Sequence, residues 1–214
     1  MIVERRMTKN PVTIRQDVPI AEAQRLMRQE KIHRLPVIDK NQKLIGIVTE
    51  KDLLYASPSP ASSLDVYEMN YLLSRLTVEK VMSSPVITIT PDTVIEEAAR
   101  IMADNDIGGL SVVKDDKLVG IITESDVFKV FIELFGAREK GIRISMLVPL
   151  TPGELSKIST AVFSAGGNII SFGSFLGTDP SNLLCIMKVS GIAKDALLAI
   201  LEPVIIEIKD IREV

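Results

Sequence analysis

The sequence predicts a mixed α/β (α+β) protein that contains two copies of one strand-helix-strand-strand-helix unit, followed by a smaller α+β domain. Three observations predict this architecture: an internal repeat in the first two thirds of the chain, the alternation of short aliphatic runs with amphipathic helical patterns inside each copy, and a β-α-β-β-α-β succession in the remaining residues. A chain of 214 residues is long enough for each part to bury a core of its own.

Composition excludes several classes of protein. Apolar residues make up 46% of the sequence and the mean hydropathy is +0.26, but no apolar run reaches the roughly 20 residues that a membrane span needs. Residues 1–10 are charged and lead into no apolar segment, so we expect a soluble, cytoplasmic protein with no membrane partner. The net charge of -3 gives no basic field for nucleic acid. With Cys185 and His33 as the sole cysteine and histidine, we expect no structural metal.

The repeat is defined by residues that recur at a constant offset. Thr13, Ala23, Met27, Ile32, Leu35 and Val37 recur 75 positions later as Thr88, Ala98, Met102, Ile107, Leu110 and Val112. Leu44, Gly46, Thr49 and Asp52 recur 74 positions later as Leu118, Gly120, Thr123 and Asp126. The change of offset places a one-residue deletion in the turn between two strands, where loops accept it.

Each copy is expected to fold in the same order. The predicted elements are extended segments at 11–14 and 85–89, helices that contain Ile20 to Met27 and Ile95 to Met102, strands at 35–38, 44–48, 110–113 and 118–122, and closing helices that begin near Glu50 and Glu124. A Ser- and Pro-rich linker at 57–63 and a connecting helix at 64–76 lie between the copies. We therefore expect the first copy with its linker at 1–66, the second with its connecting helix at 67–140, and the last domain at 141–214.

Both copies contain the same motif where a strand leads into a helix, Gly46-Ile47-Val48-Thr49-Glu50-Lys51-Asp52 and Gly120-Ile121-Ile122-Thr123-Glu124-Ser125-Asp126. One Thr-x-x-Asp alone is explained by helix capping. Its recurrence at equivalent points of a repeat resembles the ribose and phosphate signature of CBS domains, over roughly residues 7 to 135. The resemblance implies a CBS pair with pseudo-twofold symmetry and two clefts for adenosyl ligands.

The resemblance also implies which residues form each cleft. Asp52 and Asp126 would accept hydrogen bonds from ribose hydroxyls, while Thr49 and Thr123 would suit a phosphate oxygen. Adenine would lie against the opening strand of the opposite copy, at Ile87, Thr88 and Ile89 for the first cleft and at Val12, Thr13 and Ile14 for the second.

His33 and Arg34 precede the first buried strand of the first copy. They are read either as an exposed polar pair or as residues that point into the first cleft, where Arg34 would bind phosphate. Gly108 and Gly109 stand at the matching positions of the second copy and carry no charge. The sequence therefore predicts unequal clefts, of which the first prefers phosphorylated ligands.

The last third predicts strands at 142–149, 168–176, 182–189 and 204–208 and helices at 153–165 and 194–201, which is the ferredoxin-like order. Pro152-Gly153 and Gly166-Gly167-Asn168-Ile169 make it resemble an ACT domain, a fold that often binds amino acids at a subunit interface. Pro152, Gly153 and Asn168 are its candidate ligand residues. The alternative is a dimerisation domain. Cys185 alternates with apolar neighbours and is expected in the core.

A CBS pair followed by an ACT-like domain resembles the AcuB-type acetoin-utilisation proteins. This resemblance implies a regulator of carbon catabolism that acts on an unidentified protein. We expect no enzyme, because the sequence offers no convincing nucleophile-base pair or metal cluster. The expected regulatory ligand is AMP, ADP, ATP or S-adenosylmethionine, and no cofactor is required. An amino-acid-responsive regulator and a ligand-free structural module stay open as alternatives, and a homodimer is expected in each case.

Overall fold

The computed structural model describes residues 1–56 and 76–214. Contacts divide the chain into two compact units, Met1–Val127 and Phe128–Val214, so that the boundary falls inside a helix and not at the expected position after residue 140. The predicted linker at 57–63 and nearly all of the predicted connecting helix at 64–76 lie outside the described residues.

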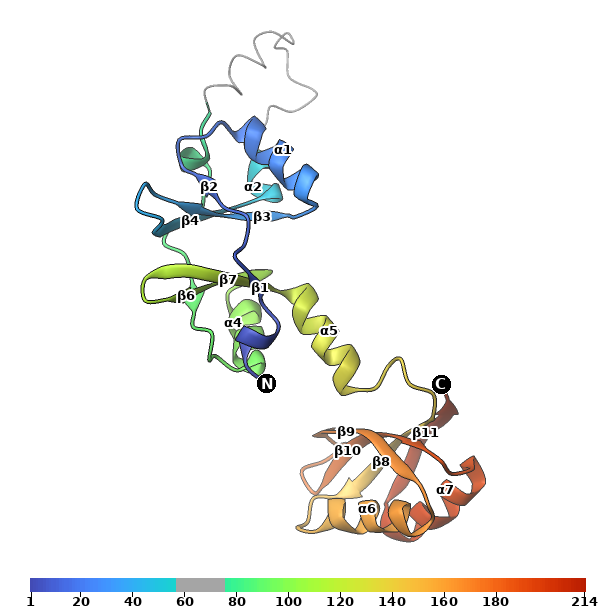
Figure 1. Ribbon diagram of the computed structural model, residues 1–214. Helices are drawn as coiled ribbons and strands as arrows, with labels where there is room; N and C mark the ends of the chain where they lie inside the picture. Colours follow the sequence, from blue (N-terminus) through green and yellow to red (C-terminus); the bar gives the residue numbers. More distant parts are fainter. Residues whose placement is uncertain (57–75) are drawn as a thin grey trace. The chain divides into compact units, whose positions relative to one another are not determined.

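The first copy forms a three-stranded sheet, in the order β2-β3-β4, with helices α1 and α2 packed on it (Figure 1). Its elements are β2 Ile14–Arg15, α1 Ile20–Glu30, β3 Arg34–Ile38, β4 Leu44–Thr49 and α2 Glu50–Tyr55. Helix α1 buries Ile20, Ala23 and Met27, which lie on one face at helical spacing. It ends at Lys31, which adopts a left-handed backbone with φ 55°.

The second copy repeats this arrangement with β5 Thr88–Ile89, α4 Ile95–Asp104, β6 Gly109–Lys114, β7 Lys117–Thr123 and α5 Glu124–Leu134. The register of each hairpin shifts at the same point, between Val37 and Ile38 in the first copy and between Val112 and Val113 in the second. The predicted repeat and the deletion in its turn are therefore confirmed, although the opening strands are shorter than expected.

Each copy is completed by a segment that the sequence order assigns to the other. Strand β1, Thr8–Lys9, pairs with β7, and the 3₁₀ turn Val3–Arg5 is hydrogen-bonded to the segment before α4. In the same way, the 3₁₀ turn Val78–Lys80 is hydrogen-bonded to residues 16 and 18 of the first copy. The predicted division after residue 66 lies outside the described residues, and strand β1 adds an N-terminal segment to the second sheet.

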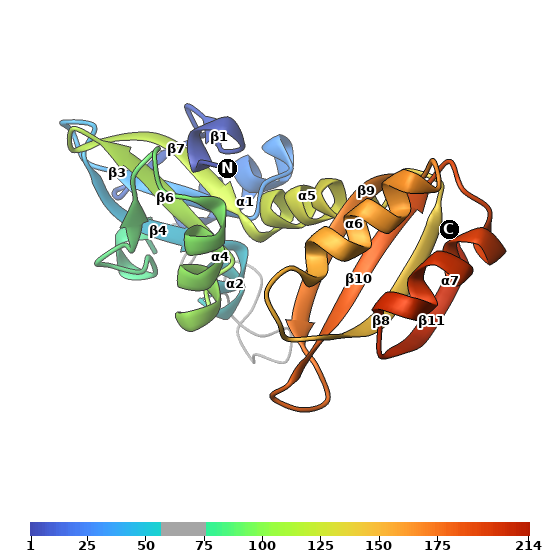
Figure 2. The same ribbon diagram turned by 90° about the horizontal axis from the view of Figure 1, so that it is seen from below.

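The unit Phe128–Val214 contains one antiparallel sheet, in the order β11-β8-β10-β9, with α6 and α7 on one face (Figure 2). Its elements are β8 Ile142–Pro149, α6 Glu154–Ser164, β9 Asn168–Leu176, β10 Asn182–Ser190, α7 Lys194–Leu201 and β11 Glu207–Glu213. The core between helices and sheet includes Ile144, Met146, Ile158, Met187 and Leu197, all fully buried. The β-α-β-β-α-β order matches the predicted ferredoxin-like order.

The last strand differs from the prediction. The apolar run at 204–208 suggested a strand, but Glu202–Val204 continue the end of α7 as a 3₁₀ turn that contains Pro203. Strand β11 begins at Glu207 and is an edge strand, whose polar residues alternate with Ile208 and Ile211 on the core side. Cys185 is 2% exposed, which confirms its predicted place in the core.

Candidate functional site

The two Thr-x-x-Asp motifs have nearly the same geometry. Thr49 Oγ1 and Thr49 N both donate to Asp52 Oδ2, at 2.7 and 2.8 Å, and Asp52 N donates back to Thr49 Oγ1 at 3.3 Å. In the second copy, Thr123 Oγ1 and Thr123 N donate to Asp126 Oδ2 at 2.8 and 3.1 Å. Each motif is thus a helix-capping arrangement, as the simpler interpretation predicts.

Capping changes the role that the threonine can have. The hydroxyl proton of Thr49 is donated to Asp52 Oδ2, so it is not available to a phosphate oxygen in this conformation. Both threonine contacts use Oδ2, and among the described residues Oδ1 of Asp52 keeps its acceptor capacity. The pair therefore fixes a carboxylate that can accept hydrogen bonds from a ligand hydroxyl.

Asp52 lies in a cavity of about 550 Å³, which we call the Asp52 cavity. Residues of both copies line it: His33, Arg34, Ile47, Thr49 to Asp52, Ser83, Pro85 to Ile87 and Asp106 to Gly109. The motif of the first copy thus faces the opening segment of the second copy. Its volume lies within the range of about 300–1,000 Å³ that is usual for small-molecule sites.

His33 and Arg34 both line the Asp52 cavity, but each side chain is directed at a carboxylate. His33 Nδ1 lies 2.7 Å from Glu50 Oε2, in a contact between exposed side chains. Arg34 extends over the second copy, where a Cβ added to Gly109 would lie 2.2 Å from Arg34 Nη1. The pKa of Arg34 is lowered from its ordinary value, because the effect of burial exceeds the opposing effect of the nearby Glu124 carboxylate.

The contrast between the clefts stays a prediction, and it depends on where the Arg34 guanidinium lies. Gly108 and Gly109 carry no charge themselves, but their missing side chains leave the space that the Arg34 guanidinium occupies. Through that space Arg34 approaches Glu124, the residue that follows Thr123 in the second motif. The positive charge predicted for the first cleft thus lies near the Glu124 carboxylate of the second motif.

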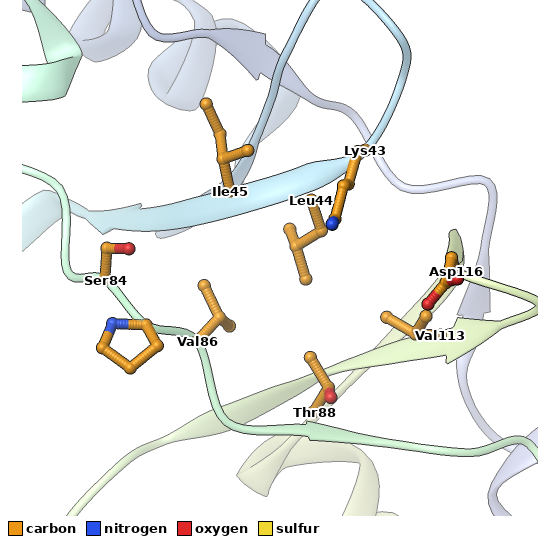
Figure 3. A pocket seen from close by; sticks show the side chains of 9 residues that line it. Lys43, Leu44, Ile45, Ser84, Val86, Thr88, Val113 and Asp116 are labelled. Carbon is orange, nitrogen blue, oxygen red and sulfur yellow. The ribbon is translucent and has the colours of Figure 1, made fainter.

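The three residues predicted to contact adenine in the first cleft lie in three different places. Ile87 lines the Asp52 cavity and is 40% exposed. Thr88 instead lines a second cavity of about 320 Å³, the Lys43 cavity, between the start of β4, residues 84–88 and the β6-β7 turn (Figure 3). Ile89 is buried in its own copy, paired with Val112. Alternation along an extended segment separates these side chains.

The matching residues of the first copy follow the same alternation. Val12 is 36% exposed, Thr13 is half-buried, and Ile14 is buried beside its partner Val37. By the repeat offset, Val12 corresponds to Ile87. The second cleft, with Thr123 and Asp126, stays a prediction.

Pro152, Gly153 and Asn168 are separated within one chain. Gly153, with φ 94°, precedes α6, whereas Asn168 follows its end. The helix has 11 residues and therefore spans about 16 Å. Asn168 and the Pro152-Gly153 turn lie at opposite ends of α6, so one chain does not bring them into a common site.

Sequence reasoning missed several residues of the Asp52 cavity. Lys51 belongs to the quoted motif, and Asp106 and Ile107 precede the glycine pair. The repeat offset could have identified them, because Asp106 to Gly109 align with residues 31–34. The charged lining residues are Arg34, Lys51, Glu50, Asp52 and Asp106. In the described part of the chain, no group of three His, Cys, Asp or Glu residues could hold a metal, and no helix could cross a membrane.

Comparison with known proteins identifies the class. The model of the CBS domain family matches residues 3–59 and 78–133, more than half of the chain. The chain belongs to the CBS-domain proteins.

Curated relatives share this region. A CBS domain-containing protein of Dictyostelium discoideum is 32% identical over 135 residues, which are 63% of this chain and 93% of the relative. The uncharacterized protein MJ1404 of Methanocaldococcus jannaschii is 36% identical over 131 residues, which are 60% of this chain. The match covers only 31% of the length of MJ1404.

Solved structures resemble the same part of the chain. The CBS domain pair of protein MJ0100, in complex with 5′-methylthioadenosine and S-adenosyl-L-methionine, is 28% identical with a TM-score of 0.52, over 65% of this chain and 98% of that one. A Vibrio cholerae protein provisionally assigned to acetoin utilization (AcuB) is 34% identical with a TM-score of 0.53, over 64% and 95% of the two chains. CBSX2 in complex with AMP is 30% identical with a TM-score of 0.50, over 61% and 96%.

Proposed function

We propose that this protein is a regulatory, non-catalytic ligand sensor, and that its CBS pair binds an adenosyl compound in the Asp52 cavity. The observation that carries the proposal is the position of Asp52. The capping contacts hold its carboxylate at a cavity whose opposite wall, at Ile87, comes from the other copy. A ligand that contacts both walls would change the relation of the two copies, which is what a sensor requires.

The charges of the Asp52 cavity favour ligands with few phosphates. Arg34 and Lys51 are opposed by Glu50, Asp52 and Asp106, so the described lining has no surplus of positive charge when His33 is neutral. A triphosphate would bring several negative charges to these carboxylates, which is unfavourable. We therefore propose AMP, S-adenosylmethionine or methylthioadenosine ahead of ADP and ATP. The MJ0100 and CBSX2 complexes, which hold ligands of this kind, support the choice.

The wider role that we propose is control of another protein by a homodimer. The similarity to the Vibrio cholerae protein supports a regulator of carbon catabolism such as acetoin use. Two alternative functions make different demands on the protein. An amino-acid-responsive regulator would need a partner chain to bring Asn168 of one copy to the Pro152-Gly153 turn of another, and a structural module would bind no ligand.

Titration calorimetry on the full chain tests the proposal. AMP, S-adenosylmethionine, methylthioadenosine and ATP are titrated into the wild-type protein, Asp52→Ala and Asp126→Ala. The two substitutions remove equivalent capping contacts, so Asp126→Ala is the matched control for folding. We expect Asp52→Ala to weaken AMP binding about tenfold or more, as the loss of charged hydrogen bonds implies.

Two results would contradict the proposal. Absence of binding by every adenosyl compound at millimolar concentration would favour the structural module. Equal affinity of the wild-type and Asp52→Ala proteins, with both folded by thermal melting, would show that the ligand does not use the Asp52 cavity.

A further inference from the structure

The unit Phe128–Val214 contains a cavity of about 370 Å³ on the side of its sheet that α6 and α7 do not cover. We call it the Phe135 cavity. Its wall is formed by the end of α5 and by side chains of β8, β9 and β10, including Phe131, Phe135, Phe175, Ile186 and the two cations Arg143 and Lys188. This site shares no lining residue with the Asp52 cavity, and it does not use the Pro152-Gly153 turn or Asn168.

Strand register shows why a hollow forms here. Side chains alternate between the faces of a strand, and Ile144, Met146 and Met187 face the helices. On the opposite face, Ile186 has Gly173 and Ser145 as its cross-strand partners. Two small residues in one row leave space above the sheet. The Phe135 ring enters that space, because a Cβ on Gly173 would lie 3.0 Å from Phe135 Cε1.

The end of α5 is fastened over the sheet by polar contacts. Ser171 Oγ donates to the carbonyl of Phe135 at 3.2 Å, and Lys188 Nζ donates to the carbonyl of Gly136 at 2.9 Å. Phe131 and Phe135 are packed together, with ring centroids 4.6 Å apart. These contacts hold the aromatic side of the cavity in place against the sheet.

Three basic residues lie side by side across strands β10, β8 and β11, next to the row that contains Ser145 and Gly173. Lys188 is the cross-strand partner of Arg143, and Arg143 is in turn the partner of Arg212. Like charges directly opposite one another destabilise a sheet. Asp210 compensates part of this row, with ion pairs to Arg212 at 2.7 Å and to Arg143 at 3.4 Å.

Among the described residues, Lys188 has no ionic partner. The residue is 5% exposed, and the part of the chain that the structure describes supplies its ammonium with one hydrogen-bond acceptor, the neutral Gly136 carbonyl. An ammonium has three donors, and a buried charge is costly unless it is paired. The cavity that Lys188 lines is therefore suited to an anion.

We propose that the Phe135 cavity binds a small organic monocarboxylate with an apolar or aromatic body. The carboxylate would accept from Lys188 and Arg143, and the body would lie among Phe131, Phe135 and Phe175. An α-amino acid fits less well, because no aspartate or glutamate side chain is among the described residues that line the cavity to receive its ammonium group. This inference is independent of the proposed adenosyl site.

The test uses phenylpropionate as the probe and the full chain. Phenylpropionate, phenylalanine and the neutral phenylpropanol are compared by ligand-observed NMR and by calorimetry. We expect phenylpropionate to bind and the other two to bind at least about tenfold more weakly, since each loses or opposes the charged hydrogen bonds. Lys188→Met should weaken phenylpropionate binding by a similar factor.

Lys209→Met is the matched control, because Lys209 lies in the same sheet but is exposed and paired with Glu207 at 2.7 Å. It should leave phenylpropionate binding unchanged. If Lys188→Met does not fold, Arg143→Gln replaces it with the same expected result. Equal binding by wild type and both cavity variants, stronger binding of phenylalanine, or no binding at millimolar concentration would each overturn the proposal. AMP titration of Lys188→Met separates this result from the fate of the adenosyl site.

Discussion

Arg34 and Glu124 approach each other beside the backbone of Gly108, although they belong to different copies of the repeat. A Cβ at Gly108 would lie 2.8 Å from Arg34 Nη2 and 2.9 Å from Glu124 Oε2. His33 is meanwhile within 2.7 Å of Glu50. His33 therefore lies beside the glutamate of the first motif, and Arg34 lies near the equivalent glutamate of the second. The two similar motifs thus have different electrostatic surroundings.

Removal of the Glu124 charge is expected to strengthen phosphate binding. In the Asp126→Ala background, which isolates the Asp52 cavity, Glu124→Gln leaves Arg34 without its nearby carboxylate. We expect about fivefold tighter AMP binding and unchanged adenosine binding, because measured interactions between solvent-exposed charges reach about 1 kcal/mol. Calorimetry at two salt concentrations measures this, with exposed Glu96→Gln as the control. An equal gain for adenosine would contradict the electrostatic explanation.

Gly109 should not accept a side chain. A Cβ there would lie 2.2 Å from Arg34 Nη1 and 3.0 Å from the Ile122 carbonyl oxygen, and the second atom belongs to backbone. Gly109→Ala is expected to lower the free energy of unfolding by about 1–3 kcal/mol, as overpacking does. Denaturant unfolding measures the loss, and Gly109→Ala combined with Arg34→Ala should recover only part of it. Full recovery would mean that the Ile122 carbonyl does not restrict the position.

Much of the fold is predictable because the repeat supplies each element twice. The patterns around Met27 and Met102 indicate the same amphipathic helix, and the shift from offset 75 to 74 locates the turn. The path of residues 1–9 is not predictable in this way. Its pairing with β7 depends on a contact between segments far apart in sequence, where Met7 packs against Gly120 as Met82 packs against Gly46.

The candidate site is predictable in its residue types but not in its contacts. Spacing identifies Thr49, Asp52 and Arg34, but it does not show that Oδ2 of Asp52 is occupied by capping contacts. Nor does it show that Arg34 approaches Glu124, because that approach depends on the space beside Gly108 and Gly109 of the other copy. Strand β11 begins later than predicted, at Glu207. An edge strand with one polar face has only a weak apolar pattern, so the sequence does not define its bounds.

The N-terminal segment at residues 1–9, which pairs with the second copy, should stabilise that copy. Val3 is fully buried, as is its counterpart Val78 in the first copy. Val3→Ala is expected to cost about 2 kcal/mol of unfolding free energy, from lost apolar burial and a residual cavity. Hydrogen exchange should show faster exchange in β6 and β7 than in β3 and β4, and Val78→Ala should reverse the pattern. Exposed Glu4→Ala is the control, and uniform acceleration after Val3→Ala would argue against separate completion of the copies.

Cys185 should react slowly while the protein is folded. Burial raises the pKa of its thiol, so the folded protein holds less thiolate than the unfolded protein at any given pH. Iodoacetamide is expected to alkylate it about tenfold or more slowly at about pH 8 than in denaturant. The group's contribution to stability is full below the unfolded pKa and is lost as pH rises through the folded pKa. Cys185 is the only cysteine, so mass spectrometry reads this site alone. Equal rates in the two states would contradict its burial.

Helix α5 carries an apolar stripe that we expect to lie in a homodimer interface. Phe128, Phe131 and Leu134 are three residues apart and are 65%, 56% and 63% exposed. Exposed apolar patches of this kind mark association surfaces. The double substitution Phe128→Ser and Leu134→Ser should convert a dimer into a monomer at micromolar concentration, measured by sedimentation equilibrium. Phe163→Ser on α6, where Phe163 is 80% exposed, is the control and should remain dimeric. A wild-type protein that sediments as a monomer, or a double variant that stays dimeric, would show that this stripe is not the interface.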